Sequence, residues 1–267
     1  MKMNEHRELR AILTAEHYQN SFISANIAGI LARHEPINHF SLEHLRDLHR
    51  EIFKDFPQAL YAKDMAGLLT DLPPEYIEFT PGVFRQPVEK NNPWSKFRTY
   101  GNKKTIYIYH SCGGEDDFAK VDTLLSSLDI RALKNADQEE KINVVTEIYE
   151  ELNFLHPFMD GNNRTNRVFV SQLAESIELP LTWNKIPDWE LRGAEDLNLL
   201  SKCSAYYTDA EVQMNIQDSL EFLEGEGYLR LRDLLEKSRS FQPEQSRVAL
   251  EERNLEHSAS ASSDFEF

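Results

Sequence analysis

Residues 156–167 read His156-Pro157-Phe158-Met159-Asp160-Gly161-Asn162-Asn163-Arg164-Thr165-Asn166-Arg167, and they join two segments whose apolar residues recur at helical spacing. Pro157 disfavours the α conformation of the residue before it, so the first helix should end at His156. Helical periodicity resumes at Arg164. The stretch is therefore predicted to form a corner between two helices.

The residue types in this corner suit the binding of a phosphate group. Gly161 and the asparagines that follow it tolerate positive φ, so their N–H groups can form an anion site at the start of the next helix. Arg164 and Arg167, spaced i and i+3, add positive charge on one face. Asp160 would repel phosphate unless Mg²⁺ lay between them. His156 can accept a proton from a hydroxyl group at neutral pH. The stretch predicts a Mg²⁺–nucleotide site with a general base.

Composition limits the other functions of the chain. Its 267 residues are 40% hydrophobic and carry a net charge of −16, which argues against broad contact with nucleic acid or an anionic membrane. Cys112 and Cys203 form neither a disulfide framework nor a metal-ligand spacing. No apolar run approaches the ~20 residues of a membrane span, and the chain begins without a signal peptide. We expect a protein that is soluble and works in a reducing compartment.

The remaining chain is predicted to be mainly α-helical, with one pair of short β segments. The β segments cover 82–85 and 105–109, joined by a turn-rich connection that contains Gly101. Ser41 is the expected N-cap of a helix, and His49 near its apolar stripe is expected to be a packed or surface residue. From residue 240 onward Ser, Glu and Gln dominate, which favours a disordered tail. Helical periodicity covers 5–34, 41–56, 116–128, 137–155, 164–177, 190–204, 208–223 and 228–235.

The stretch 156–167 resembles the signature of the Fic family, His-Pro-Phe-x-(Asp/Glu)-Gly-Asn-Gly-Arg-x-x-Arg. It agrees at every fixed position except Asn163, where the family usually has glycine. The resemblance implies a Fic-type helical core over 41–204 with a β-hairpin flap at about 80–110. N-terminal helices within 1–40, C-terminal helices within 205–239 and a disordered acidic tail at 240–267 would surround that core.

The resemblance also implies an activity, the transfer of AMP from ATP to a Ser, Thr or Tyr hydroxyl of a target protein. His156 would be the base, Phe158 would anchor the loop, and Asp160 would hold Mg²⁺. The flap would pair with the target by main-chain hydrogen bonds, and its residues are Gly82, Val83, Phe84, Arg85, Ile106 and Tyr107. The nucleotide would be bound by Gly161, Asn162, Asn163, Arg164 and Arg167.

A second resemblance concerns regulation. Many Fic proteins carry an inhibitory helix with the pattern (Ser/Thr)-x-x-x-Glu-(Gly/Asn), whose glutamate pairs with the second arginine of the signature. Ser24 to Gly29 is similar to this pattern, but Ala28 stands at the glutamate position. The resemblance then implies that Arg167 is unpaired and that the enzyme is disinhibited.

Asn163 leaves three functions open. The first is the adenylyltransferase, whose partners are ATP and a target protein. This hypothesis allows auto-modification and a homodimer, and it includes no nucleic-acid or membrane partner. The second is a Fic-type phosphotransferase with another donor, kinase-like or transferring phosphocholine. The third is a non-catalytic Fic-fold binding protein. The resemblance implies a bacterial protein that works in the cytoplasm or is delivered to a host cytosol by a secretion system.

Overall fold

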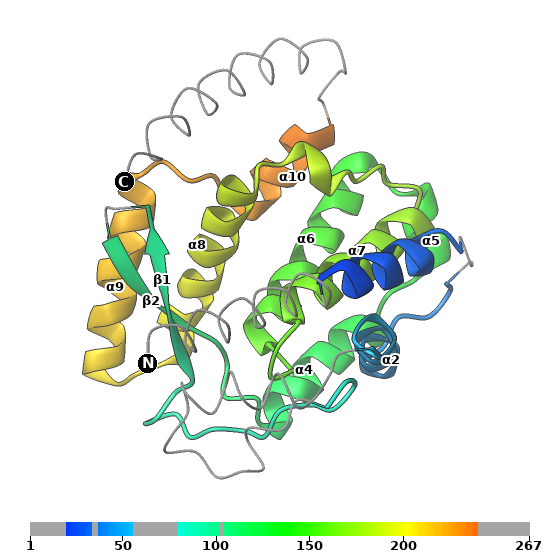
Figure 1. Cartoon of the computed structure of the whole chain (residues 1–267). Helices are drawn as coiled ribbons and strands as arrows, with labels where there is room; N and C mark the ends of the chain where they lie inside the picture. The colour runs from blue at the N-terminus through cyan, green and yellow to red at the C-terminus, as the bar shows by residue number, and fades with distance from the viewer. Residues whose placement is uncertain (1–19, 34–36, 56–79, 102–103, 240–267) are drawn as a thin grey trace, which may run out of the picture.

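Helices surround a central antiparallel pair, α6 and α7, in the computed structural model, which describes residues 20–33, 37–55, 80–101 and 104–239 (Figure 1). A two-stranded sheet lies at one side, next to α8 and α9. The expected mainly α fold with a short hairpin is confirmed. The elements are a helix over 20–31, α2 (Leu42–Ile52), β1 (Ser95–Tyr100), β2 (Lys104–Tyr109), α4 (Glu115–Ser126), α5 (Ile130–Asn135), α6 (Gln138–Leu155), α7 (Asn162–Ser176), the 3₁₀ turn η2 (Trp183–Lys185), α8 (Asp188–Tyr206), α9 (Ala210–Gly225) and α10 (Leu231–Arg239).

Local sequence signals account for the start of several helices. The Ser41 hydroxyl accepts a hydrogen bond from the His44 N–H, which confirms the predicted N-cap of α2. Asp137 accepts from Glu140 N–H at the start of α6. Gly161 precedes α7 with a φ of 77°, so this helix begins two residues before the predicted Arg164. These ends fix the corner between α6 and α7.

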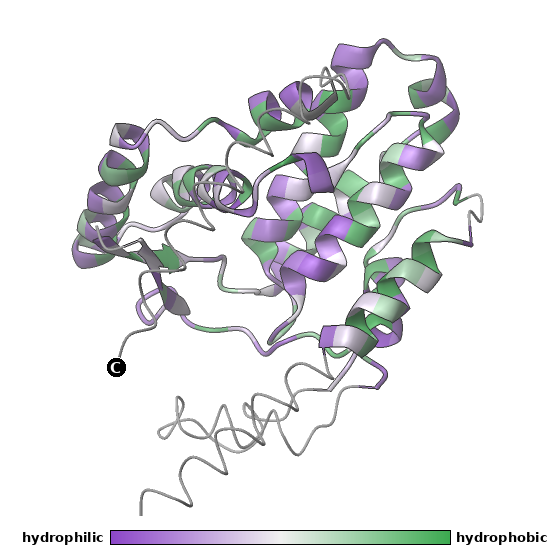
Figure 2. Ribbon diagram, turned by 45° about the horizontal axis from the view of Figure 1, so that its top comes forward, coloured by the Kyte–Doolittle hydropathy of each residue, from purple (hydrophilic) through white to green (hydrophobic). Residues whose placement is uncertain are grey.

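The core lies around α6, which packs against α7, α8, α4 and α10, while α2 packs against α7. Apolar side chains such as Leu45, Val145, Leu152 and Phe169 are fully buried there. Figure 2 shows that the helices carry both hydrophobic and hydrophilic residues, as expected when each buries one face against a shared core. No described helix has the length and apolar content that crossing a lipid bilayer requires.

The hairpin differs from the sequence prediction in its first strand. The second predicted segment is confirmed as β2, but its partner is β1, with Phe97 opposite Tyr107. The segment 82–85 is not a strand, because Gly82 forms a turn with a φ of 78° and the Arg85 side chain points into the protein. The prediction for 82–85 was wrong, since the first strand arises from the turn-rich connection instead.

The predicted helices from α6 to α10 are confirmed, with ends shifted by a few residues. The short α5 and η2 were not predicted. The N-terminal helix is described only over 20–31, and the segments 1–19, 56–79 and 240–267, which carry the remaining predictions for the termini and the irregular region, lie outside the described residues.

Candidate active site

His156 lies at the C-cap of α6 in the left-handed conformation, with φ 47° and ψ 59°. This conformation is uncommon for a residue with a side chain. The guanidinium of Arg85 holds it in place, because Nε donates to the His156 carbonyl at 2.7 Å and Nη2 donates to the Leu155 carbonyl at 3.2 Å. The Arg85 main-chain N–H donates to the Pro157 carbonyl at 2.7 Å. Arg85 thereby satisfies carbonyls that the end of α6 leaves open.

The imidazole of His156 is buried between two aromatic side chains. It stacks on His110 with ring centroids 3.6 Å apart, and Trp94 meets it edge-on at 5.4 Å. Burial, His110 and the charges of Lys96, Arg85 and Arg98 lower the pKa of His156 well below its ordinary value near 6.5. The ring is therefore neutral at pH 7. Its Nδ1 is buried and has no hydrogen-bond partner among the described residues.

The loop after His156 is held by side chains that bond to its own backbone. The Asn162 side chain accepts from the Phe158 N–H at 2.9 Å and donates to the Phe158 carbonyl at 2.7 Å. Phe158 is fully buried and stacks on His49 at 3.8 Å, which matches its predicted role as an anchor. Asn162 is thus occupied within the loop, and only its main chain remains for an anion.

His49 connects three segments at this loop. Its Nδ1 accepts from the Gly82 N–H at 2.8 Å, so Nε2 carries the proton and donates to the Asp160 carbonyl at 3.0 Å. Burial lowers the pKa of His49 to about 4, although the hydrogen bond to Asp160 opposes this and Arg164 adds to it. His49 is therefore a neutral positioning residue beneath the loop.

Gly161 has no room for a side chain. A Cβ at this position would lie 2.3 Å from the Phe53 ring, and the φ of 77° disfavours other residues. The glycine thus allows the chain to turn directly into α7, whose first N–H groups face the loop. This geometry suits an anion at the N-terminus of α7.

Asp160 is the loop residue suited to a metal ion. Its carboxylate is 44% exposed, accepts from the Gly161 N–H at 2.5 Å and lies 3.7 Å from Arg164. The described residues contain no group of three or more His, Cys, Asp or Glu side chains able to hold a metal by themselves. One exposed carboxylate beside an anion site nevertheless fits Mg²⁺, which takes one or two carboxylates together with substrate phosphates.

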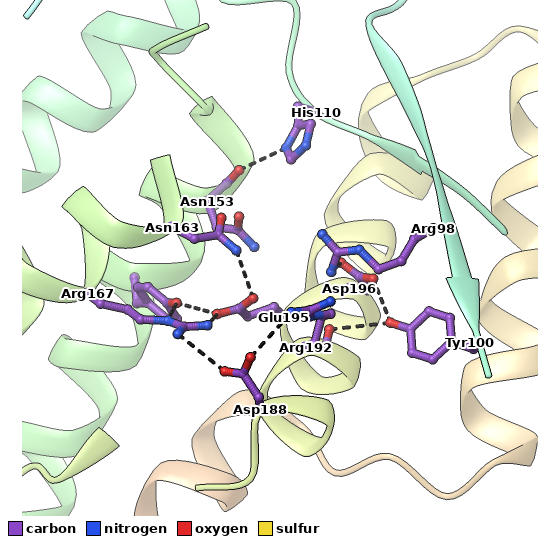
Figure 3. A network of polar contacts seen from close by, with 11 residues as sticks. Arg98, Tyr100, His110, Asn153, Asn163, Arg167, Asp188, Arg192, Glu195 and Asp196 are labelled. Atoms are coloured by element: carbon purple, nitrogen blue, oxygen red, sulfur yellow. Dashed lines mark hydrogen bonds and ion pairs between the residues drawn. The ribbon is translucent and has the colours of Figure 1, made fainter. Parts of the chain in front are cut away.

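Arg167 is paired, which corrects the prediction that it would be free. Its Nη2 lies 3.1 Å from Oε1 of Glu195 on α8, a carboxylate that is only 2% exposed. The Tyr149 hydroxyl also donates to this oxygen, at 2.5 Å, and Asn163 Nδ2 donates to the other oxygen at 3.1 Å. Arg167 also lies 3.8 Å from Asp188 (Figure 3). Burial alone would lower the pKa of Arg167, but Tyr149 and Glu195 raise it overall.

The structure does not bring the inhibitory-like segment to Arg167. Ser24, Ala28 and Gly29 are exposed on the helix over 20–31, whose buried residues such as Ile23 and Ile30 pack into the main core. The acids that meet Arg167 are Glu195 and Asp188 of α8, and no contact with position 28 is found among the described residues.

The residues predicted for the flap do not lie together on one hairpin. Arg85 is buried and holds the end of α6, while Gly82 bonds to His49. Ile106 is 1% exposed on the inner face of the hairpin, and only Tyr107 lies on its outer face, opposite Phe97. Val83 is exposed and Phe84 packs against the core.

Several residues of the site were not predicted from the sequence. Glu195 lies in α8 between buried neighbours such as Ala194 and Leu197, so an acid at a buried helical position was the available signal. His110 gave no such signal, because it follows a strand and meets His156 only through the fold.

Comparisons with known proteins show what this chain is similar to. The family model described as Fic/DOC matches residues 39–174, from before α2 to within α7. A protein adenylyltransferase of Bartonella henselae is 24% identical over 148 residues, or 55% of this chain, and the chain spans only 24% of that relative's length. The N-terminal FIC domain of Bep8, a VirB-translocated effector of Bartonella sp. 1-1C, has 17% identity and a TM-score of 0.47, with 78% of this chain and 83% of that chain covered. The BepC effector of Bartonella tribocorum with bound AMPPNP has 16% identity and a TM-score of 0.47, with 79% and 86% covered.

Proposed function

Because this chain belongs to the Fic/DOC family, whose model matches residues 39–174, we propose that it transfers AMP from ATP to a hydroxyl group of a target protein. The observation that carries the proposal is the position of His156, a neutral and buried histidine held next to the N-terminus of α7. The relative named protein adenylyltransferase supports AMP as the transferred group.

In the proposed reaction, His156 accepts the proton of the target hydroxyl. The hydroxyl oxygen then forms a bond to the α-phosphorus of ATP, the bond from that phosphorus to the bridging oxygen breaks, and pyrophosphate leaves. A base whose pKa is lowered by burial is unprotonated when the hydroxyl arrives. The charge that develops on the phosphate oxygens is stabilised by the N–H groups at the start of α7 and by Arg164.

Mg²⁺ held by Asp160 and the phosphates would neutralise phosphate charge. Phe158, Asn162 and His49 keep the loop in one conformation, so that the base and the anion site stay aligned. Arg85 fixes the carbonyl of His156, while His110 and Trp94 pack against its ring.

A second candidate is a Fic-type phosphotransferase with another donor. The observation that favours it is the ion pair between Arg167 and Glu195, with Asn163 as a further partner of the same carboxylate. A neutralised Arg167 offers less attraction to a terminal phosphate than a free arginine would. The binding affinity of a donor with fewer phosphates, such as a nucleoside diphosphate linked to an alcohol, would be reduced less by this ion pair.

One experiment separates the two candidates. The protein is incubated with Mg²⁺ and ATP labelled at the α- or γ-phosphate, with and without cell lysate as the source of targets, and modified proteins are analysed by intact mass. We expect α-label and the mass of AMP on a target or on the protein itself. Transfer of γ-label alone, or the mass of another group from a donor panel, would support the phosphotransferase instead.

Two histidine variants test whether His156 is the base. His156→Ala should abolish the transfer, whereas His39→Ala, which removes an exposed histidine ahead of α2, should leave it unchanged. Equal activity in both variants would remove His156 from the proposed mechanism.

A further inference from the structure

Lys96 on β1 is a cation without a described partner at the candidate site. Side chains alternate along the strand, so Lys96, Arg98 and Tyr100 share the partly buried face of β1. In register, Lys96 lies opposite Ile108, which is fully buried. Lys96 makes no hydrogen bond or ion pair with the residues that the structure describes. Partial burial of an unpaired ammonium group costs free energy. Binding of an anion to this lysine would offset that cost.

The start of β1 is adjacent to His156. Trp94, two residues before Lys96, contacts the imidazole of His156 edge-on at 5.4 Å. The positive charge of Lys96 contributes to the lowered pKa values of both His156 and His110. Lys96 therefore lies within electrostatic reach of the base.

The carboxylates around Lys96 are already engaged. Asp196 on α8 bonds to Arg98 at 2.8 Å and to the Tyr100 hydroxyl at 2.6 Å. Glu195 is shared by Arg167, Tyr149 and Asn163. The carboxylate of Asp160 accepts from the N–H of the following residue. Each of these acids acts on Lys96 at longer range, and none forms a direct ion pair with it.

We propose that Lys96 binds a phosphate group of the nucleotide donor, on the side of the site where Trp94 contacts His156. The hairpin then contributes a cation to the donor site, in addition to the residues of the loop 156–167. This inference rests on the proposed function for the identity of the ligand. The chemistry it requires is that of an anionic phosphate oxygen, which an ammonium group binds as a point charge.

The titration of Lys96 is consistent with this role. Burial and then Arg98 lower the pKa of Lys96 to about 8, against the opposing effect of Asp196, Glu195 and Asp160. A bound phosphate would raise that pKa again, so nucleotide binding at pH 8 should take up protons, by roughly half a proton per site.

Calorimetric titration with ATP and Mg²⁺ tests the proposal, using the wild-type protein, Lys96→Met, Lys96→Arg and Lys104→Met. Lys104 lies on the same hairpin but pairs with Asp218 on α9 at 2.7 Å, so its variant is a matched loss of charge. Removing a charge-assisted hydrogen bond should weaken binding by about 10- to 100-fold in Lys96→Met. Lys96→Arg should retain most of the affinity, and Lys104→Met all of it.

Proton uptake provides a readout that a structural role would not change. The observed enthalpy, measured at pH 8 in buffers of different ionisation enthalpy, should show uptake for the wild-type protein and none for Lys96→Met. Equal affinity and equal proton uptake in these two proteins would overturn the inference, and so would a wild-type protein that binds no nucleotide. Nucleotide binding that depends on Lys96 but leads to no AMP transfer would contradict the proposed function and would leave the proposed role of Lys96 standing.

Discussion

The side chains around His156 act mainly on the main chain of the loop. His49 bonds to the Asp160 carbonyl, Asn162 bonds to both polar groups of Phe158, and Arg85 bonds to the carbonyl of His156 itself. These bonds fix the backbone, whose own N–H groups would form the proposed anion site. Among the charged side chains of the loop, Asp160 and Arg164 lie 3.7 Å apart and are partly exposed, whereas Arg167 is held by the buried Glu195.

Glu195→Gln should release Arg167 for phosphate binding. The substitution keeps the size of the side chain and removes the negative charge that now lies 3.1 Å from the guanidinium. We expect ATP to bind about tenfold more tightly, with little change for AMP, because in the proposed donor site Arg167 meets the phosphates beyond the α-phosphate. Calorimetry with both nucleotides measures the ratio. Asp188→Asn is the matched control, since this exposed carboxylate is 3.8 Å from Arg167 and should matter little. An unchanged ratio in Glu195→Gln would contradict the expectation.

His49 should make the folded protein sensitive to acid. Its pKa is about 4 in the folded protein, against 6.5 in an unfolded chain, so between these values the unfolded chain binds a proton that the folded protein does not. Stability contributed by neutral His49 is therefore complete above pH 6.5 and falls as the pH approaches 4, by about 3 kcal/mol. Urea unfolding of the wild-type protein and of His49→Gln should show a stability difference that shrinks between pH 7 and pH 4.5. Parallel pH profiles of the two proteins would exclude this role.

The hairpin is the element that joins the site to the second half of the chain. Its inner face reaches α8 through Arg98 and Tyr100, which both bond to the buried Asp196, and β2 also packs on α9. Its outer face carries Phe97, which is 67% exposed and whose ring lies 4.7 Å from that of Tyr107, tilted by 52°. A hairpin held in this way places Trp94, just before β1, beside His156, and brings Lys96 within electrostatic reach of that histidine.

Arg98→Met should loosen the hairpin. It leaves the buried Asp196 without its cation, and breaking such a pair costs about 3–5 kcal/mol. Burial, opposed by Arg98 and Tyr100, raises the pKa of Asp196 to about 6. The cost should therefore be larger at pH 7.5, where the group is charged, than at pH 5, where it is largely protonated. Urea unfolding at both pH values and hydrogen exchange of the β1 amides measure the effect.

The exposed pair on the same hairpin supplies the control for this prediction. Lys104→Met removes a partner of Asp218 in a surface ion pair, which should cost less than about 1 kcal/mol. The two variants could lose equal free energy of unfolding, or the loss in Arg98→Met could be independent of pH. Either result would show that Asp196 is not stabilised by its ion pair with Arg98.

At the scale of the whole molecule, the helices around α6 were predictable because each has a clear apolar period, and α2 and α6 also begin at the capping residues Ser41 and Asp137. The end of α6 at His156 and the positive φ of Gly161 were also predictable from residue types. The first strand was not, because residues 82–85 have strand-like composition but serve as a turn and an anchor for α6. The partner of Arg167 was missed because Glu195 meets it only through the packing of α8.

Ligand binding should stabilise the whole fold. A ligand that binds only the folded protein adds about 2.7 kcal/mol to stability at a concentration of 100 times its Kd. ATP with Mg²⁺ should therefore raise the unfolding temperature in a concentration-dependent manner. We expect His156→Ala to show the same increase but no transfer, because the base is not needed for binding. A variant that loses both would indicate that His156 holds the loop and does not act only as the base.

Arg85 has a consequence for the order of folding. It bonds to the carbonyls of His156 and Leu155 from 71 and 70 residues away along the chain. Closing so long a loop is entropically slower than forming helices α6 and α7, whose contacts are local. We expect the helical pair to form early and the strained conformation of His156 to form last. A newly synthesised chain would then contain nearly all of its helices before it could transfer anything, so the proposed activity itself would report that folding is complete.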